Sequence, residues 1–163
     1  MENIIARHNI KILRRGEPVV DRGCNCQGDE ICEFGGRCKE RNLVYHCKVE
    51  VMGPQEVVEK TEGYIGLMSS TGKERLSNHK TSFNLRWHEE DTELSKYIWR
   101  LKDMGKKYRL KWEIMAKALP YNPKTDVCNL CNKERYYILC REDLATLNKI
   151  RDLTGECRHR KKG

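Results

Sequence analysis

Three side chains whose types suit phosphodiester chemistry follow one another closely in this sequence. A short apolar strand is expected to end at Gly63-Tyr64-Ile65-Gly66, and a polar turn and a helix come next. Thr71 and Glu74 fit the capping box S/T-x-x-E, which places the start of that helix. Arg75 and His79 are four residues apart and therefore share one helical face. The guanidinium can bind phosphate oxygens, while the imidazole and the strand's phenol can hydrogen-bond or move protons.

A second tyrosine is expected beside the first. Residues 43–51 alternate apolar and polar side chains, which predicts a strand, and Gly53-Pro54 marks the turn that follows. Residues 57–65 then pair back as an antiparallel strand, and this hairpin brings Tyr45 close to Tyr64. Either tyrosine alone could be a core aromatic with its hydroxyl satisfied. Their combination with a nearby guanidinium and imidazole favours a functional site.

The composition points to a polyanionic partner. The chain has 163 residues, a formal net charge of +8 and a pI of about 9.0, so nucleic acid is the first expectation and an anionic membrane the second. Hydrophobic residues make up 38% and charged residues 34%, which predicts a small core helped by additional cross-links. No apolar run approaches the ~20 residues of a membrane span, and no signal peptide is expected.

A cysteine-rich segment precedes the first strand. Nine cysteines without a secretory signal favour metal ligands over disulfides. Four of them lie within residues 23–38, in the order C-x-C-x5-C-x5-C, and can enclose a tetrahedral Zn²⁺: Cys24, Cys26, Cys32 and Cys38. This spacing is less usual than paired C-x2-C. Reduced thiols in a loop and a disulfide pair are the alternatives.

A second metal site is expected near the C-terminus. Cys128 and Cys131 have C-x2-C spacing, which is the stronger of the two cysteine signals. The best candidates for the two missing ligands are Cys157 and His159, although Cys140 could replace Cys157. Both zinc sites would be closed and structural.

The remaining elements complete an α+β pattern. An apolar stripe predicts a helix from about 92 to 105, and strict alternation over 108–115 predicts a third strand. Lys106 and Lys107 extend the charged face of that strand into a basic strip that suits a phosphate backbone, or is simply solvated. A helix follows Cys131, and a last helix is expected over 142–153 with Leu144, Leu147 and Ile150 facing inward.

This order of motifs resembles the GIY-YIG endonuclease domain at the C-terminus of Penelope-like retroelement polyproteins. Tyr64-Ile65-Gly66 with the spacing R-x-x-x-H matches the second half of the signature, and Leu43-Val44 stands where the first half has Gly-Ile. The matching stretches cover nearly the whole chain: His8-Asn9, Cys24-Asn25-Cys26, Val44-Tyr45, Gly63 to Leu67, Leu94 to Trp99, Cys128 to Cys131, and Cys157 to Arg160.

The resemblance implies a fold, a set of roles and a catalytic metal. The fold would be a small three-stranded antiparallel sheet flanked by helices, over residues 41–163, with an arm and zinc-binding segment at 1–40. Glu134 matches the family's metal-binding glutamate and would hold Mg²⁺ or Mn²⁺, although its stem could also simply pack at a helix edge. Asn148 falls where the family has a late active-site asparagine, and Tyr45 would be the general base.

The implied function is a DNA endonuclease that nicks target DNA so that a reverse transcriptase can prime from the new 3′ end. Its partners would be DNA, the reverse transcriptase domain of the same polyprotein and its template RNA. The basic run Arg158 to Lys162 resembles a minimal nuclear-import patch, which agrees with a nuclear location. Two other classes remain open: a zinc-stabilised nucleic-acid-binding module without catalytic activity, and a zinc-stabilised protein-interaction module.

Overall fold

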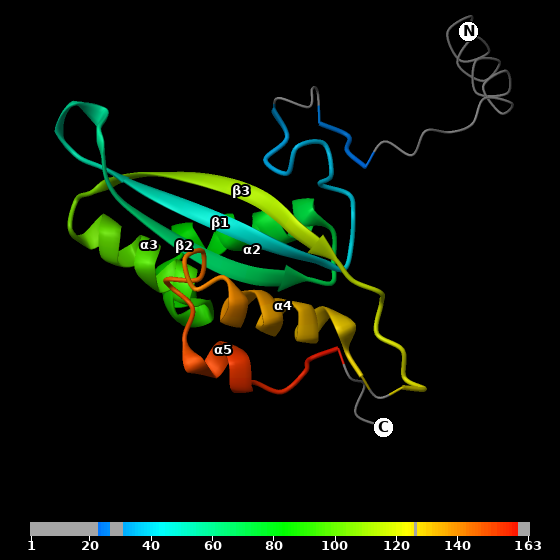
Figure 1. Cartoon of the computed structure of the whole chain (residues 1–163). Coiled ribbons are helices and arrows are strands. Elements are labelled where there is room, and N and C mark those ends of the chain that lie inside the picture. The colour runs from blue at the N-terminus through cyan, green and yellow to red at the C-terminus, as the bar shows by residue number, and fades with distance from the viewer. Residues whose placement is uncertain (1–22, 27–30, 126, 160–163) are drawn as a thin grey trace, which may run out of the picture.

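A three-stranded antiparallel sheet with helices on both faces forms the body of the protein (Figure 1). The computed structural model describes residues 23–26, 31–125 and 127–159. The expected arm over 1–22 and the end of the basic tail lie outside these residues. The three-stranded antiparallel sheet and its helices confirm the α+β architecture that the sequence predicted.

The sheet has the strand order β2-β1-β3, with β1 (Leu43–Met52) in the centre, β2 (Val58–Met68) on one edge and β3 (Lys107–Lys117) on the other. All three predicted strands are present, and β2 and β3 are longer than predicted. In the register, Cys47 pairs with Tyr64 on β2 and with Trp112 on β3, which sets three side chains side by side on one face. The 3-10 turn η3 (Pro54–Glu56) joins β1 to β2.

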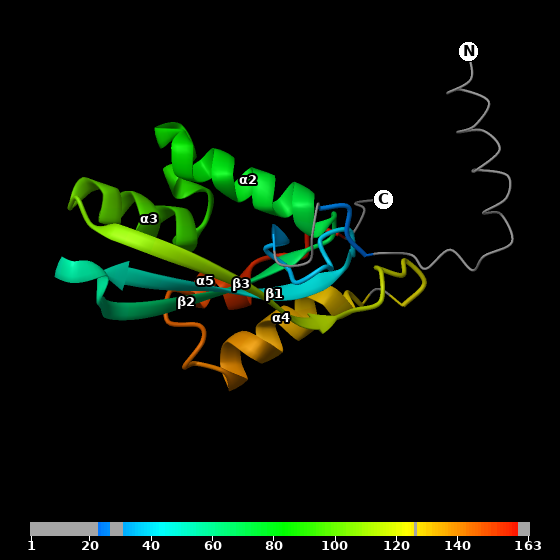
Figure 2. The same cartoon turned by 90° about the horizontal axis from the view of Figure 1, so that it is seen from above.

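Each face of the sheet has its own helical layer, as Figure 2 shows from above. One layer contains α2 (Gly72–Asn84), the 3-10 segment η4 (Arg86–Asp91) and α3 (Glu93–Asp103). The other contains α4 (Asn129–Cys140) and the short α5 (Ile150–Thr154). Both α2 and α3 begin with complete capping boxes, at Thr71 and Thr92, so their starts agree with the sequence. None of the helices in the described ranges is both long and apolar enough to cross a membrane.

The central strand is buried on both sides, and its two faces belong to two hydrophobic clusters. Tyr45, Cys47 and Val49 point into the larger cluster beneath α2 and α3. Val44 belongs to the smaller cluster beneath α4, where Ile65 is also fully buried. The polar residues that alternate along β1, such as His46 and Glu50, therefore lie on a face that is also covered and not exposed to solvent.

The last predicted helix is wrong in its extent and in the position of Ile150, although Leu144 and Leu147 pack against the core as predicted. Only Ile150–Thr154 are helical, and Ile150 is 78% exposed rather than inward. The residues before α5 instead bind the free edge of β2. The Thr146 hydroxyl accepts a hydrogen bond from Gly63 N at 2.8 Å, and Leu147 N donates to Gly63 O at 2.9 Å. These contacts satisfy edge-strand backbone groups, which a continuous helix over 142–153 could not do.

The predicted basic strip on β3 is less positive than its sequence suggests. Glu50 on β1 is buried and accepts contacts from Lys48 at 2.9 Å, Arg109 at 2.7 Å and Lys111 at 3.0 Å. These three cations hold the pKa of Glu50 down, to about 2. Part of the strip's positive charge is thus offset by Glu50, although the side chains of Lys48, Arg109 and Lys111 stay about half exposed.

Candidate active site and metal centres

A polar cleft of about 640 Å³ opens where the two helical layers meet the end of β2. Tyr64 on β2, Arg75 on α2 and Glu134 on α4 all line it. The start of α3 and residues of α5 complete the walls. Three of the side chains predicted to act together thus reach one cavity from three separate elements.

Tyr45 and His79 lie next to Arg75, in the core. The Tyr45 hydroxyl is 2.6 Å from His79 Nε2, and Arg75 Nε donates a hydrogen bond to the same hydroxyl at 3.1 Å. Because the guanidinium can only donate, the phenol's own proton is free to point at the imidazole nitrogen. His79 is held by ring contacts with Phe83 and Trp112, at centroid distances of 5.7 and 5.2 Å.

Burial sets the protonation of this pair. Tyr45 is wholly buried, and burial raises its pKa to about 12 against the opposing effect of Arg75. Burial first, and Arg75 second, lower the pKa of His79 to about 3. At neutral pH the phenol therefore keeps its proton, and His79 is a neutral imidazole whose Nε2 can accept the phenol's hydrogen bond.

Gly66 lies so close to the rings of Tyr45 and Tyr64 that a side chain would not fit there. A Cβ at this position would lie 2.5 Å from the Tyr45 hydroxyl and 2.9 Å from Tyr64 Cε1. The two ring centroids are 6.5 Å apart, as the predicted hairpin requires. A side chain at Gly66 would push both phenols away from Arg75, so this glycine is part of the site.

Glu134 on α4 brings a carboxylate to the same cleft. Burial first, and the charge of Asp152 second, raise its pKa to about 7 against the opposing effect of Arg75. Its charge also acts on Tyr45, Tyr64 and Arg75, so the carboxylate lies within electrostatic reach of these three groups. A partly buried carboxylate beside an open polar cavity is a hard oxygen donor that fits Mg²⁺ or Mn²⁺ completed by water and substrate oxygens.

Asn148 lies near this constellation but does not line the cleft. Its Oδ1 accepts from Ile65 N at 2.9 Å and its Nδ2 donates to Ile65 O at 2.8 Å. The Nδ2 also approaches Asp152 Oδ2 at 3.3 Å. The side chain thus binds the edge of β2 next to Tyr64, and a role in catalysis stays a prediction.

Several other charged residues of the cleft were not predicted from the sequence. Glu93, Arg151 and Asp152 line it together with the predicted residues. A carboxylate in the first turn of a helix is stabilised by the helix dipole, so Glu93 needed no functional explanation. Nothing in the sequence linked Glu93 to the C-terminal segment. Only the folding of α5 against the start of α3 brings these charges together.

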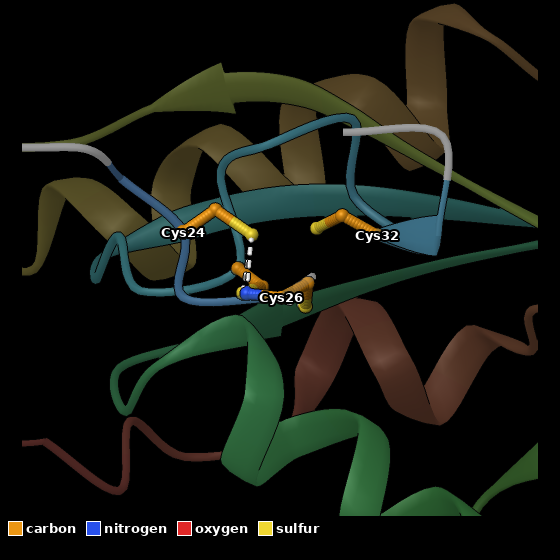
Figure 3. A group of neighbouring side chains, drawn as sticks. Cys24, Cys26 and Cys32 are labelled. Atoms are coloured by element: carbon orange, nitrogen blue, oxygen red, sulfur yellow. Dashed lines mark hydrogen bonds between the residues drawn. The ribbon is translucent and has the colours of Figure 1, made fainter. Parts of the chain in front are cut away.

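The first cysteine cluster gathers the four predicted residues. Figure 3 shows Cys24 and Cys32 pointing towards each other, with Cys26 beside them. Cys38 Sγ lies 3.8 Å from Cys26 Sγ and 3.5 Å from Cys24 Sγ, and the four sulfur atoms are all within 4.8 Å of one another. Sulfur atoms around a tetrahedral Zn²⁺ are about 3.8 Å apart, since each Zn–S bond is about 2.3 Å. The donor set therefore fits zinc.

The second cluster contains Cys128, Cys131, Cys157 and His159. His159 Nδ1 is 3.4 Å from both Cys128 Sγ and Cys131 Sγ and 3.7 Å from Cys157 Sγ. These distances also fit a tetrahedral zinc, for which sulfur and nitrogen are about 3.6 Å apart. Cys140 is exposed and outside the cluster, so it does not replace Cys157.

Comparisons with protein-family models, with curated proteins and with solved structures find no match for this chain. The function is therefore argued from the site's own geometry, with the sequence resemblance beside it.

Proposed function

We propose that the protein is a metal-dependent DNA endonuclease that nicks its target by phosphodiester hydrolysis. The observation that supports this most strongly is the cleft, which collects a phenol, a guanidinium and a carboxylate from β2, α2 and α4. A phosphodiester needs a cation for its oxygens, a group to accept the water's proton and a stabiliser for the leaving oxygen. Arg75 and Glu134 line the cleft and suit the first and third needs, and Tyr45, which is hydrogen-bonded to Arg75 just behind the cleft wall, suits the second.

Arg75 binds the scissile phosphate and stabilises the charge that builds up on it as water attacks in line with the leaving 3′ oxygen. Tyr64 is the phenol that faces the cleft, and it orients the attacking water. Glu134 would hold Mg²⁺ or Mn²⁺, which would supply positive charge to offset the negative charge that develops on the leaving oxygen. The bond from phosphorus to the 3′ oxygen breaks, leaving a 5′ phosphate, and the 3′ oxygen takes a proton from solvent water in the open cleft to become the 3′ hydroxyl.

Tyr45 accepts the water's proton and passes its own to His79 Nε2, with which it shares a 2.6 Å hydrogen bond. Because the pKa of Tyr45 is about 12, its phenolate is rarely formed at neutral pH. A concerted transfer, in which Tyr45 gains one proton as it gives up the other, avoids the phenolate. Tyr45 has no surface of its own in the cleft, and Arg75 covers its hydroxyl. Arg75 must therefore turn towards the phosphate before water reaches the base.

The two cysteine clusters bind structural zinc in this proposal. The first holds the irregular segment before β1 against α2, since Cys38 O accepts from Lys73 N at 2.8 Å. The second ties the start of α4 to the chain after α5, which orients Glu134. Through its resemblance to Penelope-like elements, we further propose a nuclear enzyme that acts on DNA beside the reverse transcriptase domain of its polyprotein and the template RNA.

Incubation with supercoiled plasmid tests this function. We expect open circles in the presence of Mg²⁺ or Mn²⁺, none with a chelator of hard cations, and nicks that a DNA polymerase can extend from their 3′ hydroxyl. We also expect DNA binding to weaken steeply with salt, because charge supplies most of the affinity.

The alternative is a zinc-stabilised nucleic-acid-binding module without catalytic activity, and the complete burial of Tyr45 favours it. Salt-dependent binding without any cutting would select this alternative. Binding that is absent, or flat with salt, would select a protein-interaction module instead.

A further inference from the structure

An ion pair spans the cleft between the two helical layers. Arg151 on α5 contacts the carboxylate of Glu93, the first residue of α3. Both residues line the cleft that also contains Arg75 and Glu134. The pair therefore lies across the space in which the proposed function places DNA.

Glu93 has a second cation near it besides Arg151. Its side chain is only 9% exposed, and Lys96 Nζ lies 3.7 Å from the same Glu93 Oε1, although this ammonium also pairs with Glu90 at 2.6 Å. Glu93 also lies in the first turn of α3, where the helix dipole stabilises a carboxylate. If Arg151 left, the carboxylate would keep a cation and the helix end as partners.

Arg151 is also less constrained than a structural arginine of the same protein. Its side chain is 58% exposed, and among the described residues Glu93 is its hydrogen-bond acceptor through Nη2 alone. Arg86, by contrast, binds both carboxylate oxygens of Asp103, reaches Glu89 and packs over Trp99. Arg151 thus has donors to spare and a carboxylate that can release it.

We infer that Arg151 is a second phosphate-binding residue of the cleft, which Glu93 holds until a DNA phosphate replaces the carboxylate. This rests on the proposed function, because it needs DNA in the cleft. Arg75 binds the phosphate that is cut, and Arg151 binds a neighbouring one. A guanidinium forms strong paired hydrogen bonds with phosphate as with carboxylate, so the exchange substitutes one anion for another.

The experiment compares two matched pairs of variants. Arg141 and Asp143 form an exposed ion pair at 3.0 Å and do not line the cleft. Arg141→Ala therefore removes the same charge as Arg151→Ala, and Asp143→Asn removes a charge as Glu93→Gln does. The affinity for a fluorescein-labelled DNA duplex is measured with Ca²⁺ in place of Mg²⁺ at several salt concentrations, and thermal unfolding is recorded for each variant.

We expect Arg151→Ala to weaken binding about tenfold. The negative slope of log affinity against log salt should become less steep by about 0.9, which is the contribution of one phosphate contact. Glu93→Gln should tighten binding several-fold, because Arg151 is then released. Arg141→Ala and Asp143→Asn should each change affinity less than about twofold, with no change of slope.

Two outcomes overturn the inference. If Arg151→Ala matches Arg141→Ala in affinity and slope, Arg151 does not contact phosphate. If Glu93→Gln weakens binding and lowers the unfolding temperature as Arg151→Ala does, the pair is merely structural. In both cases the proposed function still stands if the parent protein cuts DNA and the Glu134 variant does not. If the parent neither binds nor cuts DNA, both the proposed function and this inference are wrong.

Discussion

The two faces of the sheet are held to their helical layers in different ways. On the α2 and α3 face, Phe34 from the cysteine-rich segment packs against Tyr45 and Trp112, with ring centroids 6.4 and 6.0 Å away. Cys32 and Cys38 belong to the same large cluster, so this metal site is an addition to a real core. On the other face, the core beneath α4 is smaller, and exposed apolar side chains such as Leu139 and Ile150 remain around it.

This difference matters because the candidate site takes its parts from both faces. Tyr45, Arg75 and His79 come from the better packed side, while Glu134 comes from the side that depends more on its cysteine cluster. The first cluster should therefore contribute mainly to stability. The second should contribute mainly to catalysis, since it fixes the only predicted metal-binding carboxylate.

The largest effect is expected from breaking the second cluster. Cys131→Ser should reduce the zinc content from two ions to one and lower plasmid nicking about a thousandfold, because the first turn of α4 loses its anchor and Glu134 lies three residues further on. Elemental analysis and a nicking assay measure both. Cys140→Ser, the same change on the exposed end of the same helix, should leave zinc and nicking unchanged.

The matching change in the first cluster sharpens the comparison. Cys26→Ser should also remove one zinc, but nicking should fall only about tenfold, because Phe34 is 4% exposed and keeps the segment packed. If Cys26→Ser harms nicking more than Cys131→Ser does, the two faces do not differ as described.

Gly66→Ala should lower nicking about a hundredfold while both zinc ions stay bound. A Cβ there meets the Tyr45 hydroxyl and the Tyr64 ring, so the phenols must move by a fraction of an ångström from Arg75 and His79. Zinc content and thermal unfolding report whether the fold persists. Nicking at the parent's rate in a folded variant would show that the position of the two rings is irrelevant.

Asn148→Ala should lower nicking about tenfold and destabilise the protein by about 2 kcal/mol, because two hydrogen bonds to Ile65 are lost at an edge strand that water can partly solvate. Urea unfolding measures the stability. Asn132→Ala, at an exposed position of α4, is the matched control and should have little effect on either quantity. An unchanged stability would mean that this side chain does not hold the 142–149 segment on β2.

The smallest effect on nicking, and a purely structural one, is expected at Glu50. Its folded-state pKa, about 2, lies below the ordinary value of 4.5, so its contribution to stability is full above pH 4.5 and is lost as the pH falls towards 2. Glu50→Gln should thus be less stable than the parent at pH 7, and the gap should shrink by pH 3. A gap that is constant with pH would mean that Lys48, Arg109 and Lys111 do not stabilise the carboxylate.

Most of the elements could be predicted from the sequence because their signals are local. Alternation marked the strands around Tyr45 and Trp112, and capping boxes at Thr71 and Thr92 marked two helix starts. The cysteine sets were also predictable, since the spacing of Cys128 and Cys131 is itself a metal-site signal.

The rest depended on contacts between distant segments. Asn148 and Thr146 bind β2 residues that lie 83 positions earlier in the sequence. The apolar periodicity over 142–153 predicts a helix there and gives no sign that these two side chains bind an edge strand instead. The pairing of Glu93 with Arg151 is hidden for the same reason. Tyr45 is completely buried because Phe34 and Trp112 pack against it. The hairpin pattern alone could not predict this burial.

The most direct test of the central claim is the nicking rate of Glu134→Gln in Mg²⁺, beside its DNA affinity and zinc content. The claim predicts that nicking falls at least about a thousandfold, since the leaving oxygen loses its cation, while affinity and both zinc ions are retained. Glu142→Gln, with the same loss of charge at an exposed position outside the cleft, should nick as the parent does. Nicking by Glu134→Gln at the parent's rate would show that the catalytic metal is not held here and would contradict the proposed active site.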